Sequence, residues 1–113
     1  MAHLSLETAV RDGAAVIALT GELDLAGAVT LEQELERLEP DLSGAIVLDL
    51  RGVEFMDSSG LRAIAVAMQR TQDRGRRFAL VPGAAQVMRV FEVTRMVERL
   101  EFVTDPAEVI GAT

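Results

Sequence analysis

Two short, almost unbroken apolar runs constrain the fold of this chain more than any other feature. They cover residues 45–50 and 78–81, and such runs are typical of strands that are buried on both faces. Between them an amphipathic pattern predicts a helix that opens at residues 57–60 and ends near Gly75. Parallel strands joined by a helix need a right-handed crossover, so this pattern predicts an α/β fold with a parallel sheet.

The first half of the chain adds a hairpin and a second helix. Residues 4–10 alternate between apolar and polar side chains, Asp12-Gly13 supplies a turn, and residues 14–20 predict a second strand. Residues 26–38 change to the helical period with one buried apolar stripe, and residues 40–44 end that helix. The sequence therefore predicts an N-terminal hairpin at the edge of the sheet.

The C-terminal third completes the predicted fold. Pro82-Gly83 begins a further helix, and residues 100–107 predict a short strand or turn followed by a last helix. No linker, repeat or low-complexity segment interrupts the sequence. Residues 1–113 therefore predict one small α/β domain, with an about four-stranded, mostly parallel sheet that carries the hairpin and is flanked by helices.

The net charge limits the partners of the chain. Its 18 acidic and 11 basic residues give a formal charge of −7 at pH 7, which repels the phosphates of nucleic acids and anionic lipids. We therefore expect neither nucleic acid nor membrane as a partner. The N-terminal residues show no export-signal pattern, and the densest apolar run, residues 63–68, is far shorter than the roughly 20 residues of a membrane span. These features predict a cytoplasmic protein.

Several enzyme classes require residues that the chain lacks. Without cysteine it has no thiolate metal site and no cysteine nucleophile. All 11 basic residues are arginine, so a phosphate-binding loop or a receiver domain would lack its lysine. The single histidine, His3, lies near the N-terminus, where a catalytic triad is not expected. We predict no catalytic residue, no cofactor and no metal.

Acidic residues leave one catalytic alternative open. Glu22, Asp24, Asp49 and Asp57 lie at or near the ends of predicted strands, where α/β proteins gather their ligands. Carboxylates at such positions more often lie in solvated loops or cap helices, which is the interpretation we favour. A small magnesium-dependent enzyme that uses Glu22, Asp24 and Asp57 is the alternative.

The most informative segment is Asp57-Ser58-Ser59-Gly60. In its simplest interpretation it is a helix N-cap, worth about 1 kcal/mol. It also places two hydroxyl groups at an exposed helix start, directly after a buried strand. Free backbone N–H groups and the helix dipole favour an anion at such a position. We therefore predict that this segment is functional.

Three segments resemble a known family. Residues 55–61, Phe-Met-Asp-Ser-Ser-Gly-Leu, together with the strand at 46–50, resemble the signature of the STAS domain, whose bacterial single-domain members are anti-sigma-factor antagonists. Residues 20–24, which we predict to form a loop, match the second motif of that family at the expected distance. Residues 86–91 resemble its late helix, so the resemblance spans essentially the whole chain.

The resemblance implies a regulatory cycle centred on Ser58, the first serine of the signature. The unphosphorylated protein would bind an anti-sigma factor that is a serine kinase, and so release a sigma factor. Phosphorylation of Ser58 would switch this binding off, and a metal-dependent serine phosphatase would restore it. The implied partner-binding residues are Glu22, Asp24, Asp57, Ser58, Ser59, Gly60, Leu61 and Arg62.

Two departures from the family pattern and one further alternative accompany this interpretation. Arg95 and Arg62 stand where relatives have glycine, and we expect Arg95 to change a left-handed turn and Arg62 to face solvent near Ser58. The alternative function is a scaffold STAS domain in which Ser58 is not modified. Such a domain would serve as a subunit of a lipid-transport ATPase or of a stress-signalling assembly.

Overall fold

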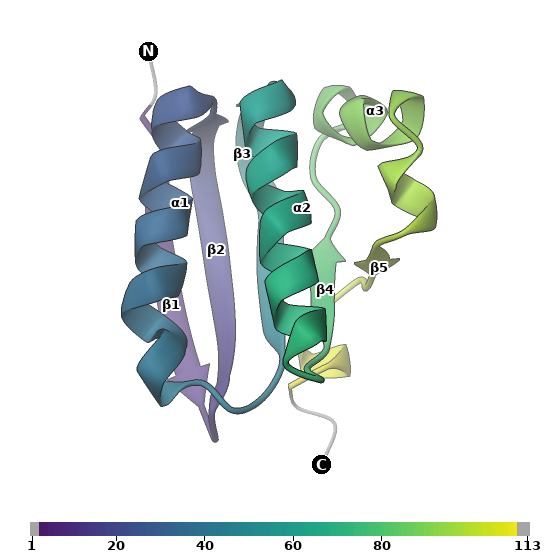
Figure 1. Ribbon diagram of the computed structural model, residues 1–113. Helices are drawn as coiled ribbons and strands as arrows, with labels where there is room; N and C mark the ends of the chain where they lie inside the picture. Colours follow the sequence, from purple (N-terminus) through teal and green to yellow (C-terminus); the bar gives the residue numbers. More distant parts are fainter. Residues whose placement is uncertain (1–2, 111–113) are drawn as a thin grey trace.

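The computed structural model describes residues 3–110, which contain one five-stranded sheet (Figure 1). The strands are β1 (Ser5–Arg11), β2 (Ala14–Leu23), β3 (Ile46–Met56), β4 (Phe78–Val81) and β5 (Glu101–Phe102), and they lie in this order across the sheet. β1 is antiparallel to β2, and all other neighbours are parallel. The predicted α/β fold with a mostly parallel sheet and an N-terminal hairpin is confirmed.

Three helices cover one face of the sheet. They are α1 (Leu25–Leu38), α2 (Ser58–Asp73) and α3 (Ala85–Val93), and α1 and α2 lie side by side (Figure 1). The strand order advances by one strand at each crossover, so right-handed connections place these helices on the same face. The main core lies between the helices and the sheet, where Leu31, Ile64 and Phe91 are fully buried.

β2 and β3 are longer than the sequence predicted. β2 continues to Leu23 and β3 to Met56, although residues 20–24 were expected to form a loop and the third strand to end near Leu50. Two register shifts between these strands disturb the alternation of apolar and polar residues, which explains why periodicity underestimates their length. Main-chain pairing with the neighbouring strand holds both extensions in the sheet.

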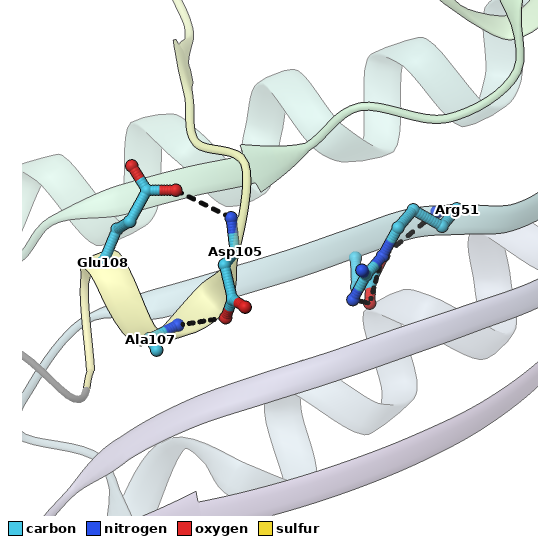
Figure 2. Close-up of polar contacts among 5 residues, drawn as sticks. Arg51, Asp105, Ala107 and Glu108 are labelled. Atoms are coloured by element: carbon cyan, nitrogen blue, oxygen red, sulfur yellow. Dashed lines mark hydrogen bonds and ion pairs between the residues drawn. The ribbon is translucent and has the colours of Figure 1, made fainter.

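The C-terminal segment covers part of the helix-free face. The last helix expected from the sequence is only a 3₁₀ turn, Pro106–Glu108, in which Asp105 accepts from the backbone N–H of Ala107 and Glu108 from that of Asp105 (Figure 2). Val109 and Ile110 follow this turn and pack on a second apolar cluster. The buried members of this cluster are Val47, Ala79, Val81 and Val103.

Candidate functional site

The two sequence motifs meet at one end of the sheet. The carboxyl ends of β2 and β3 point to the end at which α1 and α2 begin, at the top of Figure 1. Leu23 pairs with Met56 in the last register position, and the backbone N–H of Asp57 donates to the carbonyl of Leu23 at 3.4 Å. We call residues 22–24 together with residues 57–62 the rim.

Each helix of the rim begins at an aspartate that caps it. The Asp24 Oδ1 atom accepts from the backbone N–H of Gly27 at 2.9 Å. The Asp57 Oδ1 atom accepts from the backbone N–H groups of Ser59 at 2.9 Å and Gly60 at 3.2 Å. The favoured interpretation of these two carboxylates, that they cap helices, is confirmed.

Ser58 is the first residue of α2 and is exposed, whereas Ser59 is half-buried. The sequence predicted free N–H groups beside these hydroxyls, and here the structure corrects it. The Asp57 side chain accepts from two of these N–H groups, those of Ser59 and Gly60. The backbone N–H of Leu61 donates to the backbone carbonyl of Asp57. A phosphate on Ser58 would therefore face a carboxylate rather than a set of unused donors.

Burial divides the predicted partner-binding residues into two groups. Within the rim, Gly60 and Leu61 are buried, and a Cβ atom at Gly60 would lie 2.3 Å from the carbonyl oxygen of Leu23. They therefore pack α2 against the end of β2 and are not available for direct contact with a partner. The predicted residues that remain accessible at the surface are the half-buried Glu22, Asp24, Asp57 and Ser59 and the exposed Ser58 and Arg62.

Two apolar residues that no sequence motif indicated lie beside this surface. Leu25 is 69% exposed and Val29 is 45% exposed, both on the first turns of α1. Both residues lie outside the apolar stripe that α1 buries. An apolar residue outside the helical period is the sequence signal that could have indicated an exposed apolar side chain. Beside the exposed Ser58 and Arg62 of the rim, they form the mixture of apolar and polar groups that is common in protein interfaces.

A groove between α1 and α2 continues from these residues. Its upper part has a volume of about 420 Å³ and its lower part about 240 Å³. Both parts share acidic residues of α1 and residues of α2, namely Glu32, Glu36, Ala63, Val66 and Arg70. The Arg74–Glu39 ion pair, 3.0 Å between Nε and Oε1, lies at the lower part.

A metal site at the rim is not supported. Within residues 3–110, no group of three or more His, Asp or Glu side chains is arranged to hold a metal ion. Asp24 and Asp57, which the magnesium alternative required, each use one carboxylate oxygen to cap a helix.

Across residues 3–110, no helix has the length and apolar character needed to cross a membrane.

Comparison with known proteins identifies the family. The STAS domain family matches residues 5–109, and the chain therefore belongs to the STAS domain family, as the motifs predicted. The anti-sigma-F factor antagonist RsfB of Mycobacterium tuberculosis is 34% identical over 67 residues. That match covers 59% of this chain and 55% of RsfB, so the chain spans little more than half of that relative.

Two further relatives match over more of their length. The anti-sigma-B factor antagonist of Staphylococcus aureus is 26% identical over 92 residues, which cover 81% of this chain and 85% of that protein. The crystal structure of an anti-sigma factor antagonist from Mycobacterium paratuberculosis superimposes with a TM-score of 0.82 at 25% identity. This superposition covers 96% of our chain and 92% of that one, in agreement with the α/β fold described above.

Proposed function

We propose that this protein is an anti-sigma-factor antagonist whose binding is switched by phosphorylation of Ser58. In this proposal the unmodified rim binds an anti-sigma factor, and the sigma factor held by that protein is released. One observation carries the proposal: an exposed serine opens α2 directly beside the capped start of α1, in a STAS domain. The names of the relatives support the same function.

The position of Asp57 explains how a phosphate would act. Phosphorylation adds about −1.5 to −2 charges at pH 7. Because Asp57 already accepts from the N–H groups of Ser59 and Gly60, the first turn of α2 offers the phosphate little compensation. The added charge would keep its water in the free protein and lose it in a complex, so the modification opposes binding more than folding.

The size of the required effect is consistent with this mechanism. Moving a binding equilibrium from almost full to almost absent takes about 5.5 kcal/mol. An uncompensated charge buried in an interface is one of the few local changes of this magnitude. Leu25 and Val29 lie close by in α1 and would provide the apolar part of the contact, which strengthens the loss of solvation around the phosphate.

The remaining parts of the cycle belong to the same proposal. The anti-sigma factor would be a serine kinase that transfers the phosphoryl group, and a metal-dependent serine phosphatase would remove it, in the cytoplasm. The protein itself would contribute only the Ser58 hydroxyl and would not be an enzyme. The scaffold alternative, with Ser58 unmodified, gains no support from the named relatives.

The test combines partner recovery with modification mapping. The protein is used to recover an anti-sigma factor from the source cells, the purified pair is incubated with ATP, and the phosphorylated residue is mapped by mass spectrometry. We expect phosphate on Ser58 and none in the Ser58→Ala variant, with Ser43→Ala as a matched control because Ser43 is exposed far from the rim. Recovery of a transporter ATPase, or a phosphate that persists in Ser58→Ala, contradicts the proposal.

A further inference from the structure

β1 leaves one long edge of the sheet without a neighbour. Within residues 3–110 it pairs with β2 alone, and it is seven residues long, whereas β5 at the opposite edge has two residues (Figure 1). Strand edges of this length pair readily with another chain unless they are protected. We propose that this protein forms a homodimer in which β1 pairs antiparallel with β1 of a second copy, centred on Ala9.

The hairpin turn determines which backbone groups face this edge. Asp12 and Gly13 both have positive φ values, 52° and 80°, the mark of a type I′ turn, and Arg11 pairs with Ala14 around them. The residues that flank such a two-residue turn form a hydrogen-bonded pair, and bonded and non-bonded pairs then alternate. Leu6, Thr8 and Val10 therefore direct their N–H and C=O groups toward the free edge.

The side chains of β1 are complementary to themselves in one register. Pairing around Ala9 places Glu7 of each copy opposite Arg11 of the other, so the dimer contains two cross-strand pairs of opposite charge. Glu7, Ala9 and Arg11 alternate onto one face, and their positions are non-hydrogen-bonded, which brings the side chains closest. The charges that would protect a lone edge thus attract each other across the two-fold axis.

Other registers lose this complementarity. Centring on Glu7 would place two glutamates opposite each other, and centring on Thr8 would leave Glu7 opposite Ala9. In the Ala9 register, Val10, which is 44% exposed in the single chain, would be covered by Thr8 of the second copy. Thr8 is already ordered, because its hydroxyl donates to Glu34 Oε2 at 2.6 Å and keeps the side chain against α1.

The dimer would leave the rim free. Ser58 opens α2 and lies at the end of β3, and β2 separates that strand from the edge at β1. The antiparallel pairing would direct the two rims to opposite ends of a ten-stranded sheet. The dimer is therefore independent of the proposed switch, and we expect phosphorylation at Ser58 to leave it unchanged.

A single cysteine tests the register directly, because the chain has none of its own. In the Ala9→Cys variant the two sulfur-bearing residues would face each other across the axis, with Cα atoms about 4.5 Å apart, within the disulfide range of about 4.4–6.8 Å. We expect a covalent dimer on mild oxidation, seen on a non-reducing gel. Ser5→Cys, exposed on the same strand but far from its counterpart, is the matched control. Equal cross-linking of both variants overturns the proposal.

Charge exchange provides the second measurement. Glu7→Arg or Arg11→Glu alone would turn both attractive pairs into repulsive ones, and we expect either variant to weaken dimerisation at least about tenfold in sedimentation equilibrium. The double variant, and an equimolar mixture of the two single variants, should dimerise again. Circular dichroism checks that each variant is folded. A native chain that stays monomeric at millimolar concentration, or a double variant that does not recover, contradicts the proposed dimer.

Discussion

The carboxylate of Asp57 accepts a hydrogen bond from the backbone N–H of Ser59 at 2.9 Å and so fixes the first turn of α2 around Ser58. Asp57, the residue before the candidate phosphoacceptor Ser58, therefore already occupies backbone N–H groups that a phosphate on Ser58 could otherwise bind. This relationship separates two quantities that mutations at the rim can change independently, namely the stability of α2 and the electrostatic environment of Ser58.

Replacing Asp57 should show this separation. Asp57→Ala removes the cap, and we expect a loss of about 1 kcal/mol, which lowers the melting temperature by roughly 4–8 °C in a domain of this size. Asp57→Asn keeps a capping oxygen and should retain nearly native stability. Thermal unfolding followed by circular dichroism measures both. Equal melting temperatures for the alanine variant and the native protein contradict the capping role.

Gly60 should tolerate substitution poorly for a steric reason. A Cβ atom there would approach the Leu23 carbonyl oxygen to 2.3 Å, so Gly60→Ala must push α2 away from the end of β2. We expect destabilisation of about 1–3 kcal/mol, measured by urea unfolding. Ser59→Ala adds no atom at the adjacent position and is the matched control. A native midpoint for Gly60→Ala would show that the contact is not tight.

The sequence predicted the parts of this site that follow from local chemistry. Apolar periodicity located the buried strands and the two main helices, and the Asp57 cap is visible as a sequence motif because capping is a local interaction. The extension of β3 to Met56 depends on pairing with β2, which periodicity does not report. The exposure of Leu25 likewise depends on how α1 packs in the folded domain, although the helical period already placed Leu61 on the buried face of α2.

The backbone conformation at Arg95 is a second feature that depends on tertiary context rather than on local sequence. The sequence predicted that arginine at this position changes the left-handed turn of the family, but Arg95 keeps that conformation, with φ 62° and ψ 14°. A side chain in this region costs roughly 1–2 kcal/mol, and an exposed ion pair with Glu98 offsets little of it.

Arg95→Gly should therefore stabilise the protein. We expect a gain of up to about 1 kcal/mol in the free energy of unfolding, because glycine adopts a positive φ without strain. The gain is limited because glycine also has more conformational freedom in the unfolded chain. Arg99→Gly is the control, since Arg99 has a φ of −102° and should lose stability on the same change. A loss of stability in Arg95→Gly, measured by urea unfolding, would falsify the strain argument.

The carboxyl group of Glu34 should make the free energy of unfolding depend on pH. Hydrogen bonds from Arg37 and Thr8 lower the pKa of this carboxyl from 4.5 to about 2. The unfolded chain therefore takes up its proton at a higher pH than the folded chain. The stabilising contribution is complete above pH 4.5 and is lost as the pH falls from about 4.5 toward 2.

Glu34→Gln isolates this contribution. Glutamine can still accept from Thr8 but carries no charge for Arg37, so we expect the variant to be less stable than the native protein at pH 7, by about 1 kcal/mol after solvent screening. The difference should shrink below about pH 4 and be mostly lost near pH 2, where Glu34 is about half protonated in the folded chain. Glu36→Gln, exposed on the same helix, is the matched control for a change of net charge. A Glu34→Gln difference that stays constant from pH 7 to pH 2 in urea unfolding would show that the ionised carboxylate contributes nothing to folding.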